Sequence, residues 1–236
     1  MRIGLLVCDH VRPEFLGISG DNDDMFRSLF ADHDEVEVVA YDVVNGELPG
    51  DPSEADAWMT TGSRYSVNDD DPWIRNLEEF VRTVADAGIP FVGICFGHQL
   101  IAKALGGSVV KSDRGWGVGV QEVEISEDLG WGTSVRVLTS YQDQVDSLPP
   151  GGKILGWNDH CPVSVMGVGT TMLGIQGHPE FETAYSEALM ESRRGQVIPE
   201  DTVEAGLASL NEEPDGSRLA DWILEFIEHA REASPR

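Results

Sequence analysis

The chain has 236 residues, 41% of them hydrophobic, which suits one α/β domain with a sizeable core. It has 42 acidic and 16 basic residues, so its net charge of −26 repels phosphate backbones and argues against nucleic-acid binding. Three cysteines without regular spacing argue against a disulfide scaffold or a Cys-x-x-Cys zinc site and favour a reducing compartment. With no leader and no apolar run of membrane-spanning length, we expect a cytoplasmic protein without a membrane partner.

The first half of the chain alternates strands and helices. Strands are expected over residues 3–8, 36–43, 57–61 and 90–95, and helices over residues 24–30, 73–87 and 99–105. The segment 73–87 shows the clearest helical spacing, with apolar side chains at positions 73, 74, 77, 80, 81 and 84. This alternation predicts an α/β fold with a doubly wound, mostly parallel sheet flanked by helices.

The second half begins rich in strands and ends helical. Short strands are expected over residues 118–125, 135–139, 153–157, 163–166 and 172–176, which adds a small antiparallel section. Helices are expected over residues 181–190 and 217–233, joined by a charged segment over residues 191–211. The apolar face of the last helix is expected to pack on the protein's own core. We therefore expect a single domain over residues 1–236, with a helical C-terminal extension over about residues 191–236.

The acidic residues are spread along the chain and are densest at residues 21–24 and 69–71. Neither run has the glycine and glutamate spacing of a calcium loop, so we expect both to be solvated loops and no metal site. A strongly acidic surface of this kind is typical of proteins from high-salt cytoplasm, where salt screens the self-repulsion.

A cysteine stands at a predicted strand–helix turn. Cys95 follows the apolar strand 90–94 and precedes the helix, with Gly93 and Gly97 on its two sides. Such glycines allow strained dihedral angles and close backbone approach, and the turn places a nucleophile above the sheet at a helix N-terminus. A helix N-terminus favours the thiolate, which is the reactive form of cysteine. A buried structural cysteine is the alternative interpretation of this short pattern.

A histidine and a glutamate follow another apolar strand end. His178 and Glu180 are two residues apart, so on an extended chain they point to the same side and the carboxylate can orient the imidazole. A base held by a third group and paired with a cysteine is the arrangement used for acyl transfer. Cys95 and His178 both lie at the carboxyl ends of predicted strands, where open α/β sheets place their sites.

The two motifs together resemble the class I glutamine amidotransferase family. They are G-I-C-F-G-H-Q over residues 93–99 and G-I-Q-G-H-P-E over residues 174–180. The resemblance extends from about residue 2 to beyond residue 180, and it implies the flavodoxin-like fold of that family with Cys95, His178 and Glu180 as the catalytic triad. Residues 62–74 resemble a stand-alone branch that includes GMP synthase-like domains and γ-glutamyl peptidases.

The resemblance also implies further site residues. The backbone N–H groups of Ser63 and Phe96 would form the oxyanion hole, and the substrate pocket would be lined by Gly62, Gln99, Ser140 and Tyr141. Two positions depart from the family pattern, since Ser63 replaces a glycine of the oxyanion loop and Tyr141 replaces a histidine. Gly115-Trp116-Gly117 lies where the family contacts the amino-acid end of its substrate.

Three functions are compatible with these residues. The first is a glutaminase that forms a Cys95 thioester and supplies ammonia to an acceptor on a synthetase partner chain. The second is a free-standing hydrolase of γ-glutamyl peptides that uses the same triad. The third is a non-catalytic binding module, which the presence of all three triad residues disfavours. Glutamine or a γ-glutamyl compound is the expected small-molecule substrate, and no cofactor is expected.

Overall fold

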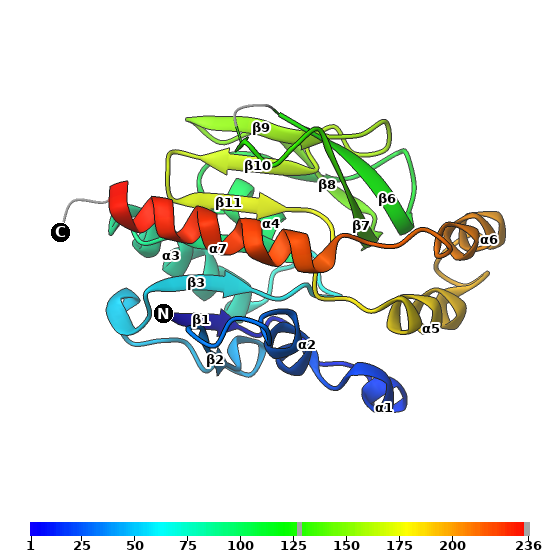
Figure 1. Cartoon of the computed structure of the whole chain (residues 1–236), viewed down its shortest axis with the longest axis horizontal. Helices are drawn as coiled ribbons and strands as arrows, with labels where there is room; N and C mark the ends of the chain where they lie inside the picture. Colours follow the sequence, from blue (N-terminus) through cyan, green and yellow to red (C-terminus); the bar gives the residue numbers. More distant parts are fainter. Residues whose placement is uncertain (127–128, 234–236) are drawn as a thin grey trace.

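The computed structural model describes residues 1–126 and 129–233 and contains one mixed sheet of nine strands (Figure 1). Its parallel region comprises, in spatial order, β2 (Glu37–Tyr41), β1 (Arg2–Leu6), β3 (Ala57–Thr60), β4 (Phe91–Ile94) and β11 (Met172–Ile175). An antiparallel region continues from β11 through β10 (Val165–Val168), β9 (Gly152–Trp157), β6 (Gly117–Ile125) and β7 (Ser134–Tyr141). The predicted α/β fold with an added antiparallel section is confirmed.

A separate antiparallel pair, β5 (Ser108–Lys111) with β8 (Asp143–Ser147), was not expected from the sequence. Its strands are short and carry charged residues at their ends, so neither shows the apolar alternation that identifies a strand.

Helices cover both faces of the sheet (Figure 1). One face carries α2 (Asn22–Leu29) and α7 (Gly216–Ala233), which share a buried cluster with strands β1, β4 and β11. The other face carries α3 (Pro72–Asp86) and α4 (Phe96–Ala104), which form a second cluster with Trp58 and Phe91. The short α1 (Leu16–Ser19) precedes α2, while α5 (Thr183–Arg193) and α6 (Glu200–Ser209) lie beside the antiparallel region.

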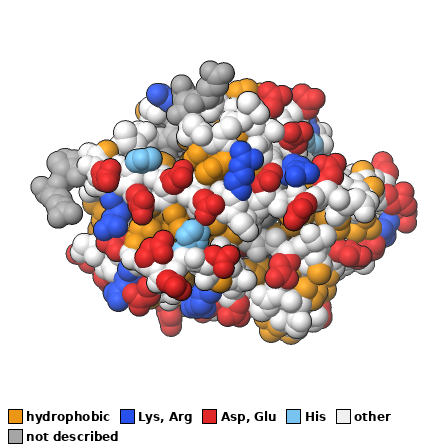
Figure 2. Space-filling model, viewed as in Figure 1, with side chains coloured by type: hydrophobic (Ala, Val, Ile, Leu, Met, Phe, Trp, Pro, Cys, Tyr) orange, Lys and Arg blue, Asp and Glu red, His pale blue; other side chains and the backbone are white. Residues whose placement is uncertain are grey.

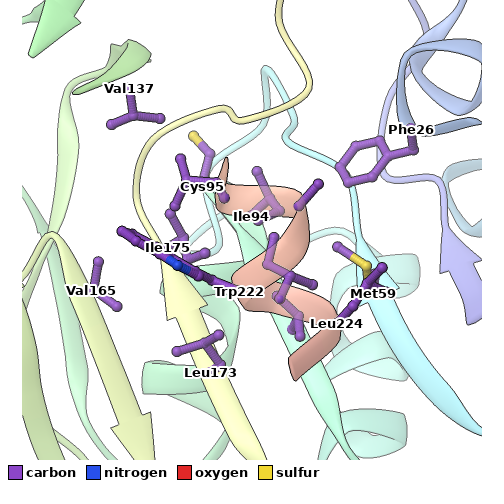
Figure 3. Close-up of a cluster of buried hydrophobic side chains, with 14 of the residues drawn as sticks. Phe26, Met59, Ile94, Cys95, Val137, Val165, Leu173, Ile175, Trp222 and Leu224 are labelled. Atoms are coloured by element: carbon purple, nitrogen blue, oxygen red, sulfur yellow. The ribbon is translucent and has the colours of Figure 1, made fainter. Parts of the chain in front are cut away.

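The C-terminal helix packs on the protein's own core, as predicted. Leu219, Trp222, Ile223 and Ile227 of α7 are buried in the cluster that contains the sheet residues Leu173 and Ile175. Figure 3 shows Trp222 and Leu224 beside Ile94 and Ile175, directly below Cys95. The predicted domain and its extension both end at residue 236; residues 127–128 and 234–236 lie outside the described residues.

Two expectations about charged segments need correction. The run 21–24 is not a solvated loop, because Asp21 is the N-cap of α2 and forms a capping box with Asp24. The segment 191–211 is more than a joining segment, because it contains α6 and the end of α5. The run 69–71 is a loop as predicted, and the Asp70 side chain is 98% exposed.

The sheet order brings distant residues together. Strand β4 lies between β3 and β11, and Ile94 pairs in register with Ile175. The residues that follow these strands therefore meet at the carboxyl edge of the sheet. This edge also includes the end of β1, which pairs in parallel with β2 on one side and β3 on the other. Over residues 1–126 and 129–233, no helix has both the length and the apolar character needed to cross a bilayer.

Candidate active site

A cleft of about 640 Å³ opens at the carboxyl ends of the parallel strands. Loops after β1, β3, β4 and β11 supply Asp9, Ser63, Cys95 and His178 to its wall. Eight of the nine residues expected at the site line this cleft, namely Gly62, Ser63, Cys95, Phe96, Gln99, Ser140, Tyr141 and His178. Glu180 does not line the cleft and lies behind His178.

Cys95 occupies a strained turn between β4 and α4. Its φ of 50° and ψ of −96° make it the one residue other than glycine with a positive φ among residues 1–126 and 129–233. Residues held in such conformations cluster at functional sites, where the surrounding structure enforces them. Cys95 is 5% exposed and is the N-cap residue of α4, so its side chain lies at the positive end of that helix.

Small residues make the turn around Cys95 sterically feasible. A Cβ atom at Gly93 would lie 2.3 Å from the carbonyl carbon of Gly97, and one at Gly97 would lie 1.6 Å from Oγ1 of Thr60. Both positions therefore require glycine for β3, β4 and the first turn of α4 to approach one another. The predicted strand–turn–helix geometry is present, and its glycines act through close packing.

His178 and Glu180 form a buried pair. Nδ1 of His178 lies 2.8 Å from Oε1 of Glu180, and the two side chains are 5% and 1% exposed. The imidazole also stacks on Phe181, with ring centroids 3.9 Å apart and an interplanar angle of 7°. The backbone N–H of His178 donates to the carbonyl of Leu138, which fixes the chain at this strand end. The ring is thus held by two contacts, and the backbone of His178 by a third.

The charges around His178 favour its protonated form. Burial alone lowers the pKa of this imidazole, but Glu180 and then the nearby Cys95 raise the pKa to about 10. Cys95 contributes both as an opposite charge and as a hydrogen-bond partner of the imidazole. The sulfur is also within 3.6 Å of Nε2 of Gln176, two residues before His178. Cys95, His178 and Glu180 therefore form one connected chain of thiol, imidazole and carboxylate.

Two backbone N–H groups were expected to bind an oxyanion, that of Ser63 in the loop after β3 and that of Phe96 at the start of α4. Among the described residues, the backbone N–H groups of Ser63 and Phe96 have no hydrogen-bond partner, whereas the N–H of Arg64 donates to Asp9. The Ser63 hydroxyl donates to the carbonyl of Cys8 at 2.9 Å, and Ser63 keeps a negative φ, so replacing the family's glycine causes no backbone strain here.

Gly62 lies against the imidazole. A Cβ atom at Gly62 would be 2.6 Å from Cε1 of His178, so any larger residue would displace the ring or the loop.

The three polar residues expected to contact substrate are partly engaged within the protein. Gln99 donates from Nε2 to the carbonyl of Asp143 at 2.8 Å and to Oε1 of Gln176 at 3.2 Å. The Tyr141 hydroxyl donates to Oε1 of Gln121 at 3.0 Å. Ser140 Oγ accepts a hydrogen bond from Nη1 of Arg193 at 3.0 Å.

Several cleft residues were not expected from the sequence. Four basic side chains line the cleft, Arg12, Arg64, Lys111 and Arg193, and Phe181 forms the stacking partner of His178. Gln176 could have been found from its spacing, because it alternates with His178 and Glu180 along the strand end. Over residues 1–126 and 129–233, no cluster of three or more His, Cys, Asp or Glu side chains is placed to hold a metal ion.

Known proteins resemble either most of this chain or a part of it. A glutamine amidotransferase-like protein of Schizosaccharomyces pombe is 31% identical over 242 residues, covering 95% of this chain and 98% of that protein. Gamma-glutamyl peptidase 5 of Arabidopsis thaliana is 28% identical over 198 residues, covering 78% and 79% of the two chains. A glutamine-hydrolysing GMP synthase subunit of Pyrococcus furiosus is 37% identical over 110 residues, covering 44% of this chain and 58% of that protein.

The fold and a family model agree with these relatives. The crystal structure of a glutamine amidotransferase from Thermotoga maritima superposes with a TM-score of 0.74 at 20% identity, covering 99% of this chain and 98% of that one. The model of the family "Glutamine amidotransferase class-I" matches residues 27–193. This chain therefore belongs to the class I glutamine amidotransferase family.

Proposed function

We propose that the protein breaks γ-glutamyl amide bonds through a thioester on Cys95. The observation that carries this proposal is the connected chain of Cys95 and His178, which line the cleft, with Glu180 behind His178. In the first step the Cys95 thiolate attacks the γ-carbonyl carbon. The resulting oxyanion accepts hydrogen bonds from the free backbone N–H groups of Ser63 and Phe96; one such donor is worth roughly 2.7–4 kcal/mol.

The imidazole then moves the protons. His178 gives its proton to the leaving nitrogen as the carbon–nitrogen bond breaks, which releases the amine and leaves a thioester on Cys95. Neutral His178 next removes a proton from a water molecule, whose oxygen attacks the thioester carbon. Collapse releases the γ-carboxylic acid, which loses its remaining proton to solvent, and restores the Cys95 thiolate and the protonated imidazole. Throughout the cycle, Glu180 stabilises the imidazolium and fixes the ring orientation.

Glutamine is the first substrate that we propose, with ammonia as the leaving amine. The relationship to a glutamine-hydrolysing GMP synthase protein supports an acceptor on a separate synthetase chain, to which the ammonia would pass. In this role the protein would act as the glutaminase partner of that chain, and docking would bring the two sites together.

A γ-glutamyl peptide is the second candidate substrate, and the size of the cleft favours it. The cleft volume of about 640 Å³ lies well within the range of roughly 300–1,000 Å³ that holds drug-sized ligands, so a leaving group larger than ammonia has room. The relationship to a gamma-glutamyl peptidase supports the same substrate class. Both reactions use the same acyl half and the same three residues.

Ammonia and amine release by the purified chain test the proposal. Glutamine and γ-glutamyl dipeptides are incubated with the wild type, with Cys95→Ala and with Cys161→Ala, which removes a core thiol outside the cleft. We expect turnover by the wild type and by Cys161→Ala but none by Cys95→Ala. Turnover that survives in Cys95→Ala would contradict the thioester mechanism. The ratio of the rates on glutamine and dipeptide ranks the two substrates.

A further inference from the structure

The cleft has the opposite charge balance to the rest of the molecule. The chain has a net charge of −26, and the face in Figure 2 shows more acidic than basic side chains. In the cleft, however, four basic side chains (Arg12, Arg64, Lys111 and Arg193) face only two carboxylates, Asp9 and Asp143. A concave site with this excess of positive charge attracts an anionic ligand.

Two of the three arginines are already engaged in holding loops together. Nε of Arg64 lies 2.9 and 2.8 Å from the two carboxylate oxygens of Asp9, and its Nη2 donates to the carbonyl of His10. Nη1 of Arg12 lies 3.4 Å from Oε1 of Glu14, and its Cζ lies 4.5 Å from the ring centroid of Phe15. Both guanidinium groups thus have a carboxylate partner within the chain.

Arg193 differs from these two. It is the last residue of α5, and its half-buried side chain reaches Ser140 Oγ and lies 5.7 Å from the ring centroid of Trp116. Among residues 1–126 and 129–233, no carboxylate lies within ion-pair distance of its guanidinium. A planar guanidinium with free N–H donors in a cleft is suited to a bidentate carboxylate.

The electrostatic surroundings of Arg193 favour an anion beside it. Burial lowers the pKa of Arg193 most strongly. The charges of Tyr185 and, to a smaller extent, Cys95 raise this pKa, whereas the neighbouring arginines Arg12 and Arg64 lower it further. Arg193 and Cys95 line the same cleft, and the charge of Cys95 acts on the guanidinium. A carboxylate beside Arg193 would offset both the burial and the repulsion from the other arginines.

We propose that Arg193 is a specificity-determining residue that binds a carboxylate of the substrate. This proposal rests on the γ-glutamyl reaction proposed above. The carboxylate has two sources, either the α-carboxylate of the γ-glutamyl half or a carboxylate on the leaving amine of a peptide. Neither source requires a change in the roles of Cys95, His178 and Glu180, because Arg193 acts on binding.

Three compounds distinguish the sources. They are γ-glutamylglycine, the same compound with the glycine carboxylate converted to an amide, and the same compound with the α-carboxylate converted to an amide. The release of glycine or glycinamide is followed for the wild type, Arg193→Gln and Arg193→Lys. Arg194→Gln is the matched control, because Arg194 is the next residue along the chain but lies outside the cleft, paired with Glu191.

For γ-glutamylglycine we expect Arg193→Gln to raise KM by about 10- to 100-fold, with a smaller change in kcat, because a charge-assisted contact is lost from binding. Arg193→Lys should recover part of the loss. Converting the bound carboxylate to an amide should raise the KM of the wild type by a similar factor. On that analogue, Arg193→Gln should then raise KM no further. The analogue on which the wild type and Arg193→Gln have the same KM identifies the carboxylate that Arg193 binds.

An equal loss on all three compounds would overturn the proposal and assign Arg193 a structural role, and no loss on any would overturn it as well. Binding of the same compounds to Cys95→Ala protein, measured by calorimetry, separates this proposal from the reaction itself. If the wild type turns over none of them, the proposed function fails. In that case the role of Arg193 is tested by binding alone. Arg193→Gln in the Cys95→Ala background should weaken the binding of the compounds that keep the recognised carboxylate, and an equal effect on the affinity for all three compounds would refute the role.

Discussion

The carboxylate of Glu180 is the main reason that His178 stays protonated in a buried site, and Glu180→Gln tests this directly. Glutamine keeps an oxygen that can accept from Nδ1 but removes the negative charge. The difference between the ordinary pKa of 6.5 and the value of about 10 in the folded protein corresponds to about 5 kcal/mol of favourable interaction with the imidazolium. Without the Glu180 charge, the effect of burial is opposed mainly by Cys95, so the pKa of His178 falls from its value in the wild type.

The loss of charge has a kinetic consequence. A smaller fraction of the imidazole is protonated near neutral pH in Glu180→Gln, so the thiolate loses part of its counter-charge. We expect kcat to fall by about 10²- to 10⁴-fold, as is usual when a general acid–base is disabled. The alkylation of Cys95 by iodoacetamide should also slow near neutral pH. Glu187→Gln, an exposed change on α5, is the matched control and should behave like the wild type.

The same variant has a signature in stability. Because the folded pKa of His178 is raised above its unfolded value, its contribution to the free energy of unfolding is complete below pH 6.5. The contribution then declines as pH rises towards 10. Denaturant titrations over this range should show a larger decline in the wild type than in Glu180→Gln. Turnover within about threefold of the wild type, together with an unchanged pH profile of alkylation, would refute this account of the pair.

Three further predictions follow from the structure. Gly62→Ala should lower kcat by about 10²-fold because its Cβ displaces His178, whereas Gly17→Ala, with no atom within 4 Å, should leave it unchanged; equal rates would contradict the steric argument. His10→Gln should lower stability by about 1 kcal/mol or less, because the side chain is 41% exposed. Burial lowers the pKa of His10 but Asp21 and Asp42 raise it overall, so the loss should be seen below pH 6.5 and vanish above the raised pKa; a loss independent of pH would contradict this. Finally, the urea midpoint should rise with KCl because salt screens the net charge of −26, and a midpoint independent of salt would remove the high-salt interpretation.

The sequence predicted the parts of the fold that depend on buried, periodic segments. Strand β4 and helix α4 were expected because their apolar residues and flanking glycines form the strand–turn–helix pattern of a nucleophile turn. Helix α6 was missed because its first turn is acidic and only Val203 and Gly206 are buried, which leaves a weak apolar stripe. The acidic residues 21–24 were assigned to a loop because composition alone does not separate a solvated run from a helix N-cap.

The candidate site shows a similar division. Cys95, His178 and Glu180 were predictable because their spacing and strand ends indicate chemistry, and the structure gives the contact that spacing could not. Arg193 could not be predicted, because a basic residue near a helix C-terminus is expected for its interaction with the helix dipole alone. Its place in the cleft depends on how α5 packs against the antiparallel region, which is a tertiary contact. We propose that the helices beyond residue 191 form part of the same domain, since α7 is buried in its core.

The account depends on a covalent bond between Cys95 and a γ-glutamyl group, and mass spectrometry of the acid-quenched reaction tests this most directly. Protein mixed with glutamine or γ-glutamylglycine is quenched within the first turnovers, digested and searched for the peptide that contains Cys95. We predict a γ-glutamyl adduct on that peptide and none on the peptides that contain Cys8 or Cys161, whose pKa values are both raised by burial. Substrate turnover without an adduct on Cys95 at any quench time, or with an adduct on another residue, would contradict the central claim.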